Sequence, residues 1–267
     1  MNTPLLSILD LAISFKTPWG LHHAVKDVSY DLYPGEVLGI VGESGCGKSV
    51  SSLAIMGLLP PQACLQRGSI LFEGKEILRL NTEEHRLLRA KKLGMIFQNP
   101  MSSLNPYLTI ATQMIEAAIA IQGISRKQAL QRAEALLERV HISEAHRRLK
   151  QYPHEMSGGM CQRIMIAMML MNCPRLLIAD EPTTALDVTI QSQILKVLCE
   201  LIQNPCPGEE MSLILISHDI GVIANMADRI AVMYAGSIVE QGVTENILAK
   251  PSHPYTQHLF SCIPSLT

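Results

Sequence analysis

The sequence predicts an α/β fold with a mainly parallel sheet, and three observations support this prediction. First, four apolar runs are continuous rather than alternating, as in strands that are covered on both faces; they span residues 37–41, 95–97, 176–179 and 213–216. Second, each run ends abruptly in polar residues. Third, 48% of the 267 residues are hydrophobic, which suffices for a sizeable interior. Because ligands gather at the carboxyl ends of strands in such sheets, the four strand ends are predicted to meet at one site.

The first of these runs leads directly into a glycine-rich loop. Its sequence is Gly42-Glu43-Ser44-Gly45-Cys46-Gly47-Lys48-Ser49. The spacing G-x-x-x-x-G-K-S lets successive backbone N–H groups turn inward onto phosphates, and a helix that starts near Lys48 adds the positive end of its dipole. The loop therefore predicts a nucleoside triphosphate site in which Lys48 reaches the β- and γ-phosphates and the Ser49 hydroxyl ligates Mg²⁺.

Two adjacent carboxylates, Asp180 and Glu181, directly follow the run at residues 176–179. Neighbouring residues of a strand face opposite ways, so the two side chains must diverge and can take different roles. We expect Asp180 to assist Mg²⁺ next to Ser49, and Glu181 to polarise the water that attacks the γ-phosphate. An Asp-Glu pair is common on protein surfaces, but here it follows an apolar run in a chain that carries a phosphate loop, which favours function.

Other parts of the chain show different periodicities. Apolar side chains alternate with polar or small ones from Leu9 to Phe15, and with residues 28–32 and 69–72 they predict a small antiparallel sheet that flanks the phosphate loop. Between residues 98 and 157 the pattern is helical, and Ser125 with Gln128 forms a capping box at one helix start. About sixty residues without a strand pattern favour an inserted helical subdomain over one more helix of the core.

A second helix start that suits an anion is predicted at Ser157-Gly158-Gly159-Met160. The segment has two interpretations: it is a simple turn with an N-cap, or its N–H groups and the helix dipole bind a phosphate. One phosphate cradle is enough for one γ-phosphate. The second helix start therefore indicates a site that another subunit completes.

Composition excludes several classes of protein. The net charge of −2 gives no global electrostatic footprint for nucleic acid, and no run approaches the 18 apolar residues that would cross a bilayer. No basic segment followed by an apolar stretch marks an export signal at the N-terminus. The seven cysteines form no C-x-x-C pair and are interpreted as reduced thiols, and neither they nor the nine histidines predict a metal site.

Six motifs occur along the chain in a diagnostic order. They are Gly42–Ser49 (Walker A), Gln98 (Q-loop), Met156–Met160 (signature), Ile178–Glu181 (Walker B), Ala185–Asp187 (D-loop) and His218 (switch histidine). In this order and spacing they resemble the ABC transporter ATPases, and the resemblance covers nearly the whole chain. It implies a P-loop NTPase (RecA-like) core in residues 1–98 and 158–245, with an antiparallel β edge, a helical subdomain in 99–157 and a C-terminal tail in 246–267.

The resemblance also implies roles for individual residues. ATP, with Mg²⁺ bound by Ser49, Gln98 and Asp180, would lie between Lys48 of one subunit and the signature of a second one, whose Ser157 and Gly159 contact the γ-phosphate. Gln98 would sense Mg²⁺ and the attacking water, His218 would hold the γ-phosphate, and Glu181 would act as the base. Met160 stands where the general signature has Gln, so only Ser157 and Gly159 are carried over from that motif.

The C-terminal segment points to a subfamily. Gly236–Gly242 and, above all, His253-Pro254-Tyr255-Thr256 resemble importers of dipeptides, oligopeptides and nickel. The implied protein is a peripheral ATPase at the cytoplasmic face of the inner membrane. Its partners would be transmembrane permeases, a second ATPase subunit, identical or sister, and indirectly a substrate-binding protein. The cargo stays open among dipeptides, longer peptides and nickel.

Two questions have alternative answers. Trp19 is predicted to stack on adenine, with Phe15 as its competitor, because an aromatic ring in a loop before the antiparallel sheet can cover a base.

Two other functions are alternatives to an importer subunit. The first is a soluble ABC-type ATPase that acts on nucleic acid or the ribosome, and such a protein would bind polyanions in a salt-sensitive way. A P-loop kinase would transfer phosphate to a small acceptor.

Overall fold

A computed structural model describes residues 3–99, 103–184, 187–205 and 210–261. The chain divides into two compact units, one formed by Met1–Arg86 with Ser212–Thr267 and the other by Leu87–Met211. Within these units the α/β architecture that the sequence predicts is confirmed. The domain boundaries predicted at residues 98, 157 and 245 are not tested by this division and stay predictions. Ala185 and Leu186 of the D-loop lie outside the described residues.

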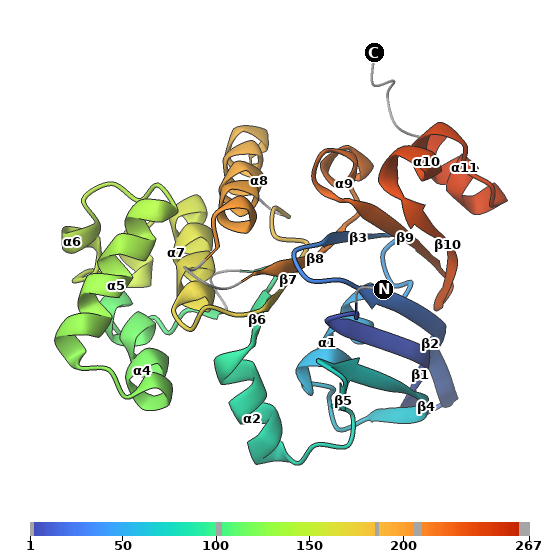
Figure 1. Ribbon diagram of the computed structural model, residues 1–267, viewed down its shortest axis with the longest axis horizontal. Coiled ribbons are helices and arrows are strands. Elements are labelled where there is room, and N and C mark those ends of the chain that lie inside the picture. The colour runs from blue at the N-terminus through green and yellow to red at the C-terminus, as the bar shows by residue number, and fades with distance from the viewer. Residues whose placement is uncertain (1–2, 100–102, 185–186, 206–209, 262–267) are drawn as a thin grey trace. The chain divides into compact units, whose positions relative to one another are not determined.

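The first unit combines a mixed sheet with short helices (Figure 1). Its strands are β1 (Leu6–Thr17), β2 (Gly20–Leu32), β3 (Val37–Val41), β4 (Ala63–Phe72), β5 (Lys75–Glu76), β8 (Ser212–Ser217), β9 (Arg229–Tyr234) and β10 (Ser237–Val243). Its helices are α1 (Lys48–Met56), α9 (Ile220–Met226), α10 (Thr244–Ala249) and α11 (Pro254–Ser261). The strand order is β5-β4-β1-β2-β10-β9-β3-β8.

The centre of this sheet carries the predicted buried strands. β3 pairs in parallel with both β8 and β9, and every residue of β3 and β8 is buried. Helix α9 packs directly on β3, where a Cβ at Gly39 would lie 2.4 Å from the Ile223 side chain. Covered faces explain why these runs are continuously apolar. The sequence pattern did not single out β9, the second partner of β3.

The antiparallel sheet is also present, but the predicted alternation is wrong in its first strand, where Ala12 and Ser14 are buried together with the apolar residues beside them. β1 pairs in antiparallel fashion with β2 and β4, as predicted. Leu9, however, is 47% exposed, whereas Leu11 and Ile13 are buried. Asp10 has a positive φ of 49°, and the register shifts between Ile8 and Leu11. Such a bulge inserts an extra residue and reverses the faces on either side of it, so a strict period of two fails there.

The second unit joins two strands to a group of helices. Its strands are β6 (Leu93–Ile96) and β7 (Leu176–Asp180), which pair in parallel. Its helices are α4 (Ile110–Gln122), α5 (Arg126–Arg139), α6 (Ala145–Arg148), the 3₁₀ helix η1 (Pro153–Glu155), α7 (Gly158–Leu170) and α8 (Val188–Gln203). α2 (Thr82–Lys91) carries the chain from the first unit into the second.

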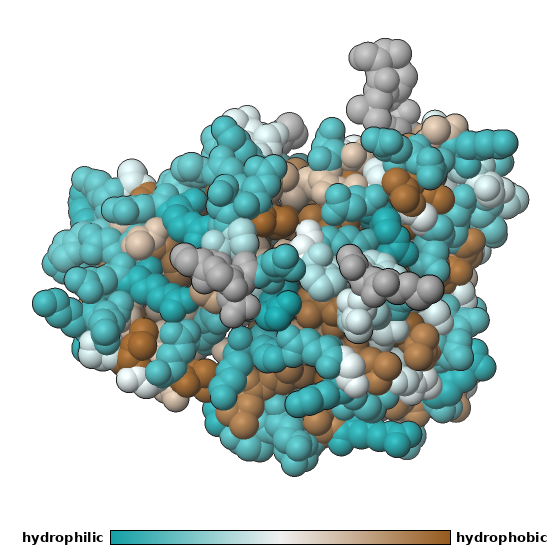
Figure 2. All heavy atoms as spheres, viewed as in Figure 1, coloured by the Kyte–Doolittle hydropathy of each residue, from teal (hydrophilic) through white to brown (hydrophobic). Residues whose placement is uncertain are grey.

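The helical segment before residue 157 forms as predicted. α5 begins with the expected capping box, since Ser125 Oγ accepts from the backbone N–H of Gln128 and the Gln128 side chain accepts from the N–H of Ser125. Its buried face, which includes Ala129, Ala133 and Leu137, packs against α4 and α7. Figure 2 shows that the visible surface over α4, α5 and α6 is mainly hydrophilic, as expected for helices that bury one face only.

The cysteines agree only in part with their interpretation as reduced thiols. Cys46, Cys64, Cys161 and Cys199 are free. Cys173 is disulfide-bonded, so the interpretation is wrong for this residue. No group of three or more potential metal ligands occurs among the described residues. Within the same residues, every helix is too short or too polar to span a membrane.

Candidate functional site

The phosphate loop connects the end of β3 to the start of α1. Gly45 and Gly47 adopt positive φ angles of 82° and 107°, which only glycine reaches without strain. α1 begins at Lys48, and its N-cap Gly47 makes no side-chain capping bond to the helix. The first N–H groups of α1, which have no acceptor within the helix, and the positive end of its dipole are therefore presented together, which is the arrangement that binds phosphate.

Lys48 lies inside this loop and is only 5% exposed. Its ammonium group donates to the carbonyl oxygens of Gly42, at 2.7 Å, and Glu43, at 2.9 Å. A buried cation is costly unless it is hydrogen-bonded, and among the described residues Nζ bonds only to these neutral carbonyl oxygens and to the Cys46 sulfur, at 3.7 Å. A triphosphate would neutralise this charge, so the residues present fit the ligand that the sequence predicts.

The phosphate loop contacts the end of β9 and the turn that joins β9 to β10. A Cβ at Gly42, whose φ is 155°, would lie 2.1 Å from the Met233 carbonyl oxygen. The N–H of Gly236, in the turn that follows β9, donates to the Cys46 carbonyl oxygen at 3.1 Å. The loop is thus fixed by close backbone contacts with a segment almost two hundred residues away in the sequence.

These contacts predict the result of replacing Gly42 with Ala. The new methyl group overlaps the Met233 carbonyl, so the loop must shift, and we expect the affinity for ATP to fall by about tenfold or more, in line with a strain of ~1–2 kcal/mol. Gly35→Ala is the control because Gly35 also has a positive φ, 73°, but has no atom within 4 Å of its Cβ position. Calorimetric titration with ATP measures both variants. Equal affinities would contradict the steric argument.

His218 lies beside the loop in the first unit. β3 and β8 run in parallel with Val41 opposite Ser217, so the next residues, Gly42 and His218, both follow the carboxyl ends of neighbouring strands. Asp219 caps α9 by accepting from Gly221 N–H at 2.8 Å, and its own N–H donates to Ser217 Oγ at 2.9 Å. The backbone around the exposed His218 is therefore well fixed.

The second unit brings Gln98 and Glu181 together. In the parallel pair of β6 and β7, Ile96 lies opposite Ala179, so both side chains follow neighbouring strand ends. Gln98 Nε2 donates to Glu181 Oε2 at 3.0 Å, and Thr184 Oγ1 donates to the same oxygen at 3.0 Å. Glu181 has a φ of 47°, which is unusual for a residue with a Cβ. Such strain is often found at functional positions.

The predicted Mg²⁺ ligands are distributed over both units. Asp180, the last residue of β7, is 8% exposed, whereas Ser49 and Gln98 are exposed. Their side chains offer carboxylate, hydroxyl and amide oxygens, which are the donors that Mg²⁺ prefers. Each donor suits the ion by its chemistry; that the three residues meet at one ion stays a prediction.

The signature segment starts α7, as predicted. Ser157 is its N-cap, with Oγ accepting from the N–H of Met160 at 3.3 Å, and it is exposed. Gly159 is buried, and a Cβ there would lie 2.8 Å from Ile190 Cγ2 of α8. Glycine is therefore required for the close packing of α7 on α8, independently of any role in binding phosphate.

The two candidate adenine-stacking residues differ in exposure. Trp19 lies in the turn between β1 and β2 and is 94% exposed, whereas Phe15 is half-buried in β1. Both belong to the unit that contains the phosphate loop. Stacking on adenine stays a prediction for both residues.

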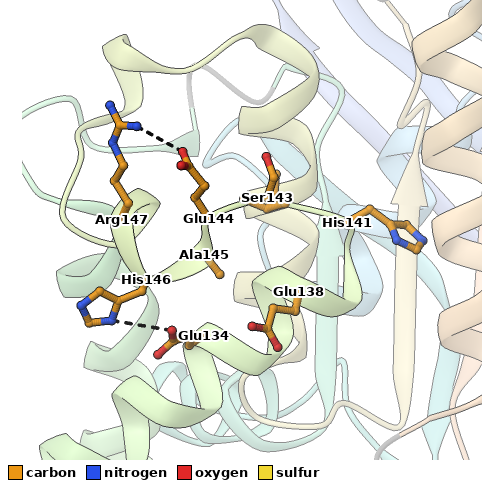
Figure 3. Close-up of a pocket in the computed structure, with 9 residues that line it drawn as sticks. Glu134, Glu138, His141, Ser143, Glu144, Ala145, His146 and Arg147 are labelled. Carbon is orange, nitrogen blue, oxygen red and sulfur yellow. Dashed lines mark hydrogen bonds and ion pairs between the residues drawn. The ribbon is translucent and has the colours of Figure 1, made fainter.

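An open pocket of about 630 Å³ lies apart from these residues, along α5 and α6 (Figure 3). Its charged side chains point toward one another: His146 Nδ1 lies 3.6 Å from Glu134 Oε1, and Arg147 Nη1 lies 3.2 Å from Glu144 Oε2. These side chains are already paired with one another at the surface. We therefore assign no ligand to this pocket.

Comparison with known proteins identifies the class. The family described as "ABC transporter" matches residues 25–184, and "Oligopeptide/dipeptide transporter, C-terminal region" matches residues 239–267. The chain belongs to the ABC transporter family and is an ATP-binding, ATP-hydrolysing subunit of that class. The predicted family and fold are thus confirmed.

Individual relatives are named as parts of transporters. The oligopeptide transport ATP-binding protein OppD of Bacillus subtilis is 52% identical over 265 residues, which cover 99% of this chain and 73% of the relative. The dipeptide transport ATP-binding protein DppD of the same species is 51% identical, over 98% of this chain and 77% of the relative. The structure of cbiO1 from Clostridium perfringens, part of the ABC transporter complex cbiONQ, superposes with a TM-score of 0.77 at 27% identity, covering 92% of this chain and 91% of that one.

A dimeric cassette is also similar. The cassette MJ0796, solved as a dimer in a post-hydrolysis state with ADP and Pi, has a TM-score of 0.78 at 26% identity and covers 90% of this chain and 98% of its own.

Three further residues contact the predicted site residues of their own unit. Thr184 binds Glu181, Gly236 binds the phosphate loop, and Tyr255 accepts a hydrogen bond from the N–H of Glu43. Thr184 could have been identified from the sequence, because it lies three residues after Glu181 of the Walker B motif. Tyr255 belongs to a segment noted as a mark of the subfamily, but no local pattern indicates that it contacts a loop 212 residues away.

Proposed function

We propose that this chain powers an importer of oligopeptides or dipeptides. The observation that carries the proposal is the match of residues 239–267 to the oligopeptide/dipeptide transporter C-terminal region, which includes the His253-Pro254-Tyr255-Thr256 segment. The relatives named above, which the chain matches over nearly its whole length, are named for the same cargo. Among the cargoes left open by the sequence, these names favour peptides over nickel. They do not favour an ATPase that acts on nucleic acid or the ribosome.

In the proposed mechanism, the loop Gly42–Ser49 holds the phosphates of ATP through its N–H groups and Lys48. Bound Mg²⁺ would supply charge neutralisation at the phosphates, and Ser49, Asp180 and Gln98 would hold it. Glu181 takes a proton from the attacking water, and Gln98 and Thr184 orient its carboxylate through their hydrogen bonds to Oε2. His218 donates to the γ-phosphate as charge develops there.

The proposed assembly is a head-to-tail pair of ATPase subunits, identical or sister. Ser157 is exposed at the start of α7, where it can contact the γ-phosphate bound by the second subunit, and buried Gly159 keeps this helix start in place. The helical subdomain, residues 99–157, would contact transmembrane permeases at the cytoplasmic face of the inner membrane. A substrate-binding protein would deliver the cargo. Closure and reopening of the pair would drive the permeases between two states.

Uptake by whole cells tests the cargo. Deleting the gene is expected to abolish uptake of labelled di- and tetrapeptides and to leave uptake of radioactive nickel unchanged. Restoring the gene should restore uptake, whereas a Glu181→Gln copy should not. Affinity capture from solubilised membranes should recover peptide permeases with the chain. Loss of nickel uptake with normal peptide uptake would contradict the proposal.

A further inference from the structure

The C-terminal helix α11 contacts the phosphate loop directly. Tyr255, the second residue of α11, accepts a hydrogen bond from the N–H of Glu43 at 3.1 Å. Both residues belong to the first unit, so this contact does not depend on the placement of the second. Glu43 is the second residue of the phosphate loop Gly42–Ser49. The hydroxyl of Tyr255 therefore holds one end of that loop.

The Tyr255 ring is fixed on its other side. Its centroid lies 4.2 Å from that of Tyr234, the last residue of β9, with the two planes tilted by 34°. This ring contact restricts the orientation of the Tyr255 side chain. Burial raises the pKa of the Tyr255 hydroxyl above its ordinary value, although the N–H of Glu43 acts in the opposite direction. The hydroxyl is thus neutral at physiological pH and able to accept the Glu43 N–H.

A carboxylate anchors the start of α11 to the sheet. Glu240 of β10 accepts from the N–H of Ser252 at 2.7 Å and from that of His253 at 3.0 Å. His253 Nδ1 in turn accepts from the N–H of Tyr255 at 3.1 Å. Although burial alone would raise it, the pKa of Glu240 is lowered because hydrogen bonds favour its ionised form. A continuous series of hydrogen bonds thus leads from β10 through the His-Pro-Tyr segment to the phosphate loop.

We propose that Tyr255 is a positioning residue for ATP, and that the C-terminal segment anchored by Glu240 holds the phosphate loop in its binding conformation. This inference rests on the proposed nucleotide site at Gly42–Ser49. A loop that is ordered before the ligand arrives loses less conformational entropy on binding, so its support increases affinity. The support acts on binding of ATP and not on the transfer of a proton, which is the work of Glu181.

Tyr255→Phe tests this proposal because it removes the hydroxyl and keeps the ring against Tyr234. Losing one hydrogen bond of ordinary strength predicts that KM for ATP rises about three- to tenfold while kcat stays within about twofold. Tyr234→Phe is the matched control, since no hydrogen bond of its hydroxyl to a described residue is present, and its KM should be unchanged. Steady-state hydrolysis by the full chain gives both constants. An unchanged KM in Tyr255→Phe, or a fall in kcat alone, would overturn the proposal.

A double variant separates positioning from simple packing. Glu240→Ala alone should raise KM about as much as Tyr255→Phe, because both remove the same support. The double variant should be no worse than either single one, since effects within one connected network are not additive. Additive effects would overturn the role of Glu240 as the anchor.

Failure of the inference can be told apart from failure of the proposed site. If Lys48→Ala abolishes ATP binding while Tyr255→Phe binds normally, the nucleotide site stands and only the role of Tyr255 is wrong. If Lys48→Ala binds ATP normally, the site assignment itself is wrong, and the role of Tyr255 falls with it.

Discussion

Glu181→Gln is expected to reduce ATP turnover by about 10²- to 10⁴-fold, the usual contribution of a general base. An amide cannot take the proton of the attacking water. Its oxygen can still accept the hydrogen bonds that Gln98 and Thr184 now donate to Glu181 Oε2, so the local geometry should be kept. Affinity for ATP should therefore stay within about twofold of that of the unaltered chain.

Phosphate release and calorimetric titration measure these two quantities separately. Glu83→Gln is the matched control: it makes the same chemical change at a carboxylate that is 63% exposed and paired with Arg86 at 2.6 Å. Turnover in this control should be normal. Undiminished hydrolysis by Glu181→Gln would show that another group acts as the base.

Lys48→Ala is expected to weaken binding of ATP by about 100-fold, because charge-assisted hydrogen bonds to phosphate are among the strongest in proteins. Removing this side chain also removes its bonds to the Gly42 and Glu43 carbonyl oxygens. Part of the loss will therefore reflect a less ordered loop. Calorimetric titration with ATP measures the total loss.

Lys75→Ala provides the control for charge alone, because Lys75 is an exposed lysine of β5. Its affinity for ATP should be unchanged, and the melting temperatures of both variants should be compared with that of the unaltered chain. Normal binding of ATP by Lys48→Ala would refute the assignment of the phosphate loop.

Local patterns in the sequence predict the elements that depend on neighbouring residues. The runs before Gly42, Asp180 and His218 form buried parallel strands, and the capping box at Ser125 is present. The run before Gln98 also forms a parallel strand, but β6 ends at Ile96 and Phe97 is exposed. In each case the signal lies within a few residues of the feature that it predicts. The pairing of strand ends follows because parallel neighbours end at the same edge of a sheet.

Features that depend on distant contacts could not be predicted in this way. The apolar stretch of β9 is visible in the sequence, but its position beside β3 follows only from the folded sheet. The bulge at Asp10 depends on simultaneous pairing of β1 with β2 and β4. The bond between Glu43 and Tyr255 joins residues 212 positions apart, and no periodicity spans that separation.

The exposure of Trp19 has a practical consequence. This residue is the single tryptophan of the chain, and it is 94% exposed in the turn between β1 and β2. Intrinsic fluorescence excited at the red edge of protein absorption therefore comes from one identified position. The unlabelled protein carries its own optical probe, and a titration with nucleotide reads the surroundings of that turn without any chemical modification.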